Sequence, residues 1–341
     1  MAIYIDPSYP DYYGDKLFDI NDKSLNRDGT LLPFARMRTQ LKSRGLDIHT
    51  FDFWNQHSTG DNVDSYFSLG MLGNYRQLIG NKNINLAGFI IMEPPAVAPR
   101  LYKVLPEITK YFDCVYLHNV HGDGYSLKGV DRSKLRKFYW PQPFSDVLQP
   151  SWSREDRLER IVVINGNHLP RSFSRELYSK RIAAMAALAP LNNVDLYGRG
   201  WSAWWSHRSM WPPYWMNYRK LMSVYRGSCE SKYDVLAKYK FSLCFENMAM
   251  EGYVTEKIFD CFFAGCVPLY LGATDIDRLI PQDTYIDCRQ FTSWLEMNEY
   301  VRSISARDTD KMRERARNFI MSENYKIYYN SLLNIFSDTK L

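Results

Sequence analysis

The chain lacks any long apolar run. No stretch approaches the ~20 consecutive apolar residues of a membrane-spanning helix. The first residues, MAIYIDPSYPDYYGDK, have neither a basic start nor a continuous apolar segment. We therefore expect no signal peptide and no spanning helix. The expected location is the cytoplasm, with at most peripheral contact at the inner face of a membrane.

The chain also lacks a paired cysteine motif and a strong charge. Its six cysteines include no C-x-x-C pair, and most lie in apolar runs such as SLCF, which predicts reduced thiols in the core. The formal net charge of +5, spread over 341 residues, produces a weak field. Such a field favours anionic substrates or an acidic membrane surface, but it is not the footprint of a nucleic-acid-binding protein.

Two phosphate-binding fingerprints are missing as well. The sequence contains neither G-x-x-x-x-G-K-[ST] nor G-x-G-x-x-G. Their absence argues against a P-loop enzyme and against a typical nicotinamide enzyme. A phosphate group would instead have to be held by cationic side chains and by the start of a helix.

What the chain does have is length and a repeated alternation of extended and helical patterns. At 341 residues it exceeds the size at which one core usually stops growing, so we expect two domains. Both halves alternate between strands and helices, which predicts an α/β fold. In the first half we expect a helix up to Arg44 followed by a strand within 30–54, a strand at NLAGFIIMEPP, a helix at PRLYKVLPEITKYF and a strand at DCVYLHN. In the second half we expect a strand at ERIVVING, a helix at SRELYSKRIAAMAALAPL and a strand at NVDLYGRG. A stretch rich in Pro and Ser at 140–153 lies between the two halves, and we place the boundary near 155, giving domains at 1–155 and 156–341.

The most informative segment runs from residue 239 to residue 272. YKFSLCF, which ends at Phe245, has the pattern of a buried parallel strand. Thr255 is placed to be the N-cap of a short amphipathic helix that Gly265 ends, and 267–271 is the next buried strand. This βαβ connection puts its loops at the carboxyl edge of the sheet, where open α/β sheets bind ligands.

Glu256 and Lys257 lie in the first turn of this helix. Lys257 combines a positive charge with the amino end of a helix, which suits a phosphate group. Glu256 either accepts hydrogen bonds from ribose or sugar hydroxyls or forms an ordinary ion pair with Lys257, and the residues alone leave both readings open. The segment is therefore a candidate site for an anionic ligand.

Several motifs occur in the order found in a known family. YKFSLCFEN, GYVTEKIFD and AGCVPLYLG resemble the signature of the α-1,3-fucosyltransferases of glycosyltransferase family 10, and VVINGN, SKRI and VDLYGRGW resemble that family's first βαβ unit. A fainter resemblance continues through IIMEPP, YFDCVYLHN and KFYWPQPF. The resemblance, to a bacterial-type member, implies a GT-B architecture in which two Rossmann-like domains face a central cleft. It also implies inverting transfer of L-fucose from GDP-L-fucose to a glycan hydroxyl.

The resemblance assigns the acceptor to the domain at 1–155 and the GDP-sugar to the domain at 156–341, whose terminal helices we expect to pack back on the first domain. Family members hold the diphosphate without a metal, so we expect no metal ion and no cofactor besides the donor. In the family an arginine and a lysine neutralise the charge of the diphosphate instead, and they match Arg181 and Lys257 of this chain. Arg181 offers the bidentate geometry that phosphate oxygens accept.

The family's catalytic glutamate precedes a proline in an E-x-P pattern, and Glu93 in IIMEPP matches it. The local sequence supports a role for Glu93 as the general base. An apolar strand brings Glu93 to the edge of the sheet, and Pro94 and Pro95 stop the strand and stiffen the backbone. Apolar neighbours should raise the pKa of Glu93, as a base requires.

The other donor-side candidates match the family more loosely. Tyr253 matches a tyrosine beside the nucleotide, and Glu246 with Asn247 would orient the fucose or the loop. Asn165 and Gly166 follow the first strand of the second domain, where a glycine lets the backbone approach the nucleotide.

The acceptor side departs from the family. Where many members have a tryptophan and acidic residues, this chain has LHNVHGDGY, so we expect His118, His121 and Asp123 to alter the contacts with the acceptor. A metal site built on the two histidines is the less favoured reading. The tryptophan-rich insert at 201–225 either covers a sugar or fills the cleft, and its role stays open.

No motif in the sequence identifies the acceptor or the product. The family indicates an oligosaccharide or a lipid-linked glycan, joined α-1,3 to N-acetylglucosamine or glucose, in protein glycosylation or surface polysaccharide biosynthesis. The nearest alternative keeps the fold and uses another GDP-deoxysugar. A third reading is a non-catalytic glycan-binding or nucleic-acid-binding protein that uses its many aromatic residues, although we expect no nucleic-acid partner.

Overall fold

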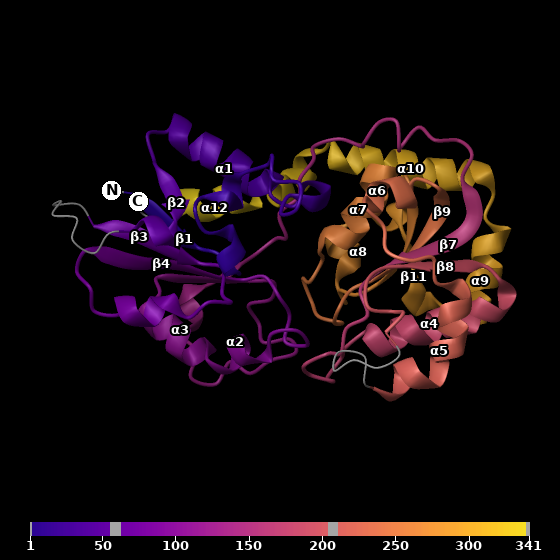
Figure 1. Cartoon of the computed structure of the whole chain (residues 1–341), viewed down its shortest axis with the longest axis horizontal. Helices are drawn as coiled ribbons and strands as arrows, with labels where there is room; N and C mark the ends of the chain where they lie inside the picture. The colour runs from indigo at the N-terminus through magenta and orange to yellow at the C-terminus, as the bar shows by residue number, and fades with distance from the viewer. Residues whose placement is uncertain (1, 55–62, 204–210, 339–341) are drawn as a thin grey trace. The chain divides into compact units, whose positions relative to one another are not determined.

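A computed structural model of the protein describes residues 2–54, 63–203 and 211–338. The chain divides into two compact units (Figure 1). Unit 1 comprises residues 1–143 and 326–341, and unit 2 comprises residues 144–325. The division lies upstream of residue 155 because the stretch at 140–153 joins unit 2 from residue 144 onward, where the Leu148 N–H donates to the Phe263 carbonyl at 2.8 Å.

Unit 1 is built on a parallel sheet whose strands lie in the order β2-β1-β3-β4-β5-β6. The strands are β1 (Ile3–Asp6), β2 (Ile48–Thr50), β3 (Asp64–Ser68), β4 (Ile84–Ile91), β5 (Cys114–Leu117) and β6 (Leu135–Lys137). Both faces of the sheet are buried: Ile90 of β4 packs in one apolar cluster, whereas Phe89 and Ile91 pack in another. The predicted strands at β2, β4 and β5 are confirmed, and the β4 run is continuously apolar for this reason.

Helices cover this sheet. They are α1 (Leu32–Ser43), α2 (Pro99–Lys103), α3 (Leu105–Tyr111), α11 (Lys326–Tyr329) and α12 (Ser331–Asp338). The single helix expected over PRLYKVLPEITKYF is in two pieces, because Pro106 lies in the first turn of α3, where a residue without an N–H starts a helix. Figure 1 shows α12, in yellow, among the elements of unit 1, where Phe336 packs in one core cluster with Ile3 and Phe34.

Unit 2 contains a second parallel sheet, in the order β11-β10-β9-β7-β8. The strands are β7 (Leu158–Ile164), β8 (Val194–Tyr197), β9 (Tyr239–Phe245), β10 (Val267–Leu271) and β11 (Ile286–Asp287). The first four are the strands that the sequence predicts. Together, the two parallel sheets with their helices confirm the α/β class.

The helices of unit 2 connect these strands. They are α4 (Tyr178–Leu188), α5 (Pro212–Val224), α6 (Lys232–Leu236), α7 (Glu256–Ala264), α8 (Ile276–Leu279), α9 (Trp294–Ser303) and α10 (Ala306–Ile320). The predicted βαβ unit is present as β9, α7 and β10. Gly265 ends α7 with a φ of 72°, a left-handed conformation that glycine adopts without strain.

All six cysteines are free thiols, four of them buried. Among the helices that the structure describes, none has the length and apolar character needed to cross a bilayer.

Candidate functional site

A buried glutamate organises the end of β9 and the start of α7. Glu246 directly follows β9, and its side chain is 0% exposed. One carboxylate oxygen accepts from the Thr255 backbone N–H at 2.8 Å, and the other accepts from the Thr255 hydroxyl at 2.7 Å. Thr255 is the N-cap residue, as expected, but its side chain makes no cap bond. Its hydroxyl instead donates to Glu246 and accepts from the Lys257 ammonium. Glu246 therefore fixes the loop between strand and helix.

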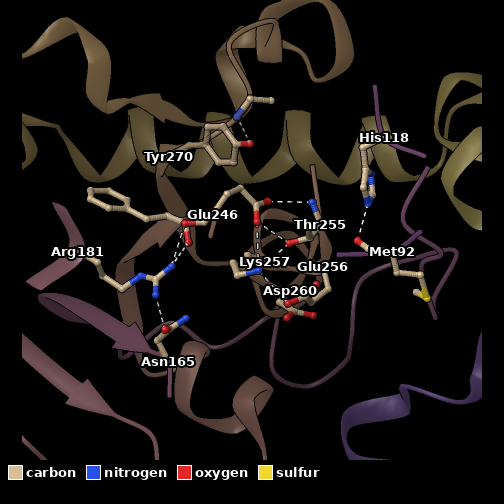
Figure 2. A network of polar contacts seen from close by, with 12 residues as sticks. Met92, His118, Asn165, Arg181, Glu246, Thr255, Glu256, Lys257, Asp260 and Tyr270 are labelled. Atoms are coloured by element: carbon tan, nitrogen blue, oxygen red, sulfur yellow. Dashed lines mark hydrogen bonds and ion pairs between the residues drawn. The ribbon is translucent and has the colours of Figure 1, made fainter. Parts of the chain in front are cut away.

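Lys257, in the first turn of α7, is held by this arrangement. Its ammonium lies 2.8 Å from Thr255 Oγ1, 3.1 Å from Glu246 Oε2 and 3.2 Å from Glu256 Oε1 (Figure 2). Burial lowers the pKa of Lys257, but the Glu246 and Glu256 carboxylates outweigh burial and raise the pKa above its ordinary value. Lys257 therefore keeps its positive charge at the amino end of a helix.

Arg181 lies beneath the same edge of the sheet. It belongs to α4 and is 2% exposed, so it is not a helix-surface residue. Its guanidinium donates to the Asn165 side-chain oxygen at the end of β7, and to the carbonyls of Phe245 (2.5 Å) and Glu246 (3.1 Å) at the end of β9 (Figure 2). Burial lowers the pKa of Arg181. Its contacts hold a second cation at the carboxyl ends of two adjacent strands.

A cavity of about 140 Å³, which we call the unit 2 cavity, opens among these groups. Asn165, Glu256 and Lys257 line it, as do two charged residues that the sequence did not single out, Lys232 and Asp260. Burial raises the pKa of Glu256, but Lys257 and Lys232 outweigh burial and bring the pKa below its ordinary value. Glu256 Oε2 is buried and has no hydrogen-bond partner within the described ranges. It is available to accept hydrogen bonds from a ligand.

Asp260 and Lys232 are the residues that sequence reasoning missed. The Lys232 ammonium lies 2.8 Å from Asp260 Oδ2, and the Tyr233 hydroxyl donates to Asp260 Oδ1 at 3.0 Å. Burial raises the pKa of Asp260 to about 7, although Lys232 favours the carboxylate. A signal existed for Asp260, which lies one helical turn after Glu256 and therefore on the same face of α7. Lys232 lies in α6, a separate helix earlier in the chain, and no sequence motif pointed to it.

Of the donor-side candidates, only Asn165, Glu256 and Lys257 line the unit 2 cavity; Arg181, Glu246 and the remaining candidates do not. Tyr253 is fully buried. The Asn247 carbonyl accepts from the Leu177 N–H at 3.1 Å. A Cβ on Gly166 would lie 2.5 Å from the His168 ring, so a larger residue there would displace that side chain.

The tryptophan-rich insert places one buried indole against the end of β7. Trp201 is buried, and its indole N–H donates to the Asn165 carbonyl at 2.6 Å. Trp201 thus packs against the end of β7 as a filler, while Trp215 on α5 is partly exposed. The middle of the insert, at 204–210, lies outside the described residues.

Glu93 lies in unit 1, two residues beyond the end of β4, and is half-buried. It lines a cavity of about 160 Å³, which we call the unit 1 cavity. The other lining residues are Ser8, Tyr9, Tyr12, Leu17, Thr30, Leu31, Phe34, Leu69, Met71, Met92, Leu101 and Trp140. Glu93 is the one charged residue among these, so a carboxylate meets a largely apolar and aromatic wall.

The three acceptor-side candidates do not reach this cavity within the described part of unit 1. His118 is 0% exposed, and its Nε2 bonds to the Met92 carbonyl at 2.7 Å (Figure 2). This burial corrects the expectation that His118 contacts the acceptor. His121 is exposed, Asp123 is half-buried, and their backbone N–H groups both donate to the Asn119 side-chain oxygen. In the ranges described, no three His, Cys, Asp or Glu residues form a metal-binding group.

The chain is similar to known proteins in its carboxyl-terminal half. Residues 171–327 match the family model described as glycosyltransferase family 10 (fucosyltransferase) C-term. An α-(1,4)-fucosyltransferase of Arabidopsis thaliana is 41% identical over 69 residues, which are 20% of this chain and 17% of that protein. The α-(1,3)-fucosyltransferase FucT of Helicobacter pylori is 34% identical over 73 residues, or 21% of this chain and 15% of that protein. The matched segments thus span less than a fifth of these curated relatives.

Solved structures resemble the whole chain. A crystal structure of an α1,3-fucosyltransferase aligns with 99% of this chain and 89% of its own, with a TM-score of 0.53 and 17% identity. A structure of an α1,3-fucosyltransferase with GDP aligns over the same shares, with a TM-score of 0.51 and 15% identity. At such identities the likeness shows the fold, which is the GT-B fold of glycosyltransferases.

Proposed function

We propose that the protein transfers L-fucose from GDP-L-fucose to a hydroxyl group of a glycan, because residues 171–327 match the family model of the glycosyltransferase family 10 fucosyltransferases. One observation carries this proposal. The matched region holds Arg181 and Lys257 at the carboxyl edge of its sheet, both fixed by hydrogen bonds before any ligand arrives. Fixed cations at this edge suit a departing nucleoside diphosphate, because they need no reorganisation as its charge develops.

The donor contacts follow from the same geometry. Lys257 adds its charge to the amino end of α7, where a diphosphate is favoured. Glu256 lines the unit 2 cavity, and its Oε2 has no hydrogen-bond partner among the described residues, so in this proposal it accepts from hydroxyl groups of the ribose or the fucose. Lys257 lines the unit 2 cavity, and Arg181 adds a second positive charge from its buried position at the ends of β7 and β9. With these two cations near the diphosphate, we expect no requirement for a metal ion or another cofactor.

Glu93 supplies the base in this proposal. The acceptor oxygen attacks the anomeric carbon from the face opposite the diphosphate, and the bond between that carbon and the β-phosphate oxygen breaks. The acceptor proton passes to the Glu93 carboxylate, and GDP leaves with the bonding electron pair. Inversion at the anomeric carbon follows from this single displacement, for which one base suffices.

The unit 1 cavity indicates the chemical class of the acceptor. Apart from Glu93, its described lining carries no charge, and Tyr9, Tyr12 and Trp140 contribute aromatic surface. Aromatic walls suit the apolar faces of a sugar ring, whereas a charged acceptor would lose hydration there without gaining a partner. We therefore propose a neutral glycan acceptor. Because the named relatives include α-(1,3) and α-(1,4) enzymes, an α-1,3 linkage to N-acetylglucosamine or glucose is the first to test.

The direct test incubates the protein with GDP-fucose and an array of neutral and sialylated oligosaccharides. We expect one fucose mass to be added to neutral acceptors, with release of one GDP per transfer, detected by mass spectrometry. A parallel panel of GDP-linked deoxysugars tests the alternative donor. If the protein binds glycans but neither binds nor hydrolyses any GDP-sugar, it is a glycan-binding module; salt-sensitive binding of an oligonucleotide would instead favour a nucleic-acid-binding protein.

The pKa of Asp260 predicts a pH dependence of donor binding. Asp260 loses its proton as the pH rises through about 7 and then adds a negative charge to the unit 2 cavity. GDP-fucose should therefore bind more tightly at pH 6 than at pH 8, by up to about tenfold if binding shifts this pKa by one unit. Calorimetry with GDP-fucose is preferred over GDP, because the terminal phosphate of GDP itself ionises near about pH 6.

A matched pair of variants tests whether Asp260 causes this pH dependence of donor binding. Asp260→Asn should flatten the pH dependence, since the amide carries no titrating proton. Asp234→Asn, an exposed position on the neighbouring α6, should retain the wild-type profile. A pH dependence that persists unchanged in Asp260→Asn would show that another group is responsible.

A further inference from the structure

Two buried side chains hold the backbone of the segment that carries Glu93. The His118 ring nitrogen Nε2 bonds to the Met92 carbonyl at 2.7 Å, and the Tyr102 hydroxyl donates to the Glu93 carbonyl at 2.9 Å. His118 is 0% exposed and Tyr102 is 7% exposed. Figure 2 shows the His118 ring pointing directly at the Met92 carbonyl. Two consecutive carbonyl groups are thus each fixed by a side chain.

The sheet explains why these bonds are needed. β4 pairs with β5 as far as Ile91 and Leu117, the last residues of the two strands. Met92 and His118 are the next residues on each strand, and the ladder stops there because two prolines without N–H groups follow Glu93. Side-chain donors from His118 and Tyr102 take over where the backbone ladder ends. A buried carbonyl without such a donor would cost free energy.

His118 also supports the wall of the unit 1 cavity. Its ring lies parallel to the Trp140 indole, with 6.1 Å between ring centroids and 12° between planes, and it meets Phe138 edge-on. Trp140 and Glu93 both line that cavity. One buried histidine therefore contacts both the backbone beside the carboxylate and the aromatic surface next to it.

We propose that His118 and Tyr102 are positioning residues that set the location of the Glu93 carboxylate. The proposal rests on the proposed role of Glu93 as the base. Neither residue touches the reacting atoms; each acts by fixing a carbonyl, which requires His118 to carry its proton on Nε2. A base must be held within about 0.5 Å of its productive position, and a 1 Å displacement costs on the order of 10²-fold in rate.

Four variants test the proposal. His118→Leu and Tyr102→Phe remove one donor each, and we expect kcat to fall about 10- to 100-fold while the KM values for donor and acceptor change little. His118→Gln keeps an N–H donor near the position of Nε2, and it should recover most of the loss. Lys103→Gln, at an exposed position next to Tyr102 on α2, should behave as the wild type. Recovery by glutamine separates a hydrogen bond from mere packing.

A second measurement does not depend on activity. Hydrogen exchange of the amides in residues 91–98 should be faster in His118→Leu and Tyr102→Phe than in the wild type, and unchanged in Lys103→Gln. If His118→Leu does not fold, Tyr102→Phe decides, because it removes a single oxygen atom and keeps the ring. If the wild type transfers no fucose, the proposed function fails, and the exchange rates still test the backbone contacts.

Wild-type kcat together with unchanged exchange in His118→Leu would overturn the proposal. So would a His118→Gln variant as slow as His118→Leu, because the hydrogen bond would then not be the cause. Wild-type kcat together with unchanged exchange in Tyr102→Phe would show that Tyr102 is not a positioning residue.

Discussion

Replacing Glu93 by glutamine is expected to lower kcat for fucose transfer by about 10²-fold or more and to leave the affinity for GDP-fucose unchanged. Glutamine keeps the shape of the side chain and therefore the packing of the unit 1 cavity. It cannot accept the proton of the acceptor hydroxyl. Initial rates of GDP release, compared with donor binding by calorimetry, measure the two quantities separately.

Glu107→Gln is the matched control for this experiment. Glu107 is also a glutamate of unit 1, but its side chain is 40% exposed and pairs with Arg76 at 3.5 Å, and it does not line the unit 1 cavity. Its replacement should leave kcat near the wild-type value, since an exposed ion pair contributes little. Turnover of Glu93→Gln at the same level as this control would remove Glu93 from the role of base.

Replacing Lys257 by methionine is expected to produce the second large effect, on both stability and donor binding. The Glu246 carboxylate is 0% exposed and lies 3.1 Å from the Lys257 ammonium. Without that cation, a buried carboxylate would remain uncompensated, which typically costs about 3–5 kcal/mol in the free energy of unfolding. Denaturant-induced unfolding of the ligand-free protein measures this loss, and calorimetry measures the expected loss of GDP affinity.

The double variant Glu246→Gln/Lys257→Met separates the two effects. It removes both charges, so most of the lost unfolding free energy should return, while the amide oxygen introduced at position 246 would still accept from the Thr255 N–H. GDP affinity should stay low, because the double variant still lacks the ammonium group. A double variant with wild-type GDP affinity would contradict a contact between Lys257 and the diphosphate.

Local patterns predicted much of unit 2. The apolar run at β9, the helix start at Glu256 and the glycine after α7 each carry their signal within a few residues, and the structure confirms all three. The same reasoning missed β1 and β3. β1 has only four residues and is followed by a Pro- and Tyr-rich loop, so its pattern is too short to read, although it pairs with both β2 and β3.

The sequence could not show which residues of the candidate sites are buried. Arg181 and His118 look like surface residues in isolation, because each has polar neighbours in the chain. The fold buries both and gives each a carbonyl acceptor, so Arg181 ties two strand ends together and His118 holds the strand end before Glu93. Lys232 joins Asp260 from a separate helix, and no spacing along the chain records that contact.

By itself, the sequence determined the α/β class, the βαβ unit at residues 239–271 and the identity of Glu256 and Lys257 as residues at the start of its helix. These properties depend on side chains that are neighbours along the chain. Only the tertiary structure decided that Glu246 contacts Lys257, that Asp260 lies in the unit 2 cavity with a raised pKa, and that His118 is buried and bonds to the Met92 carbonyl beside Glu93. Such properties depend on which groups the fold removes from water and brings together, and a one-dimensional pattern does not contain that information.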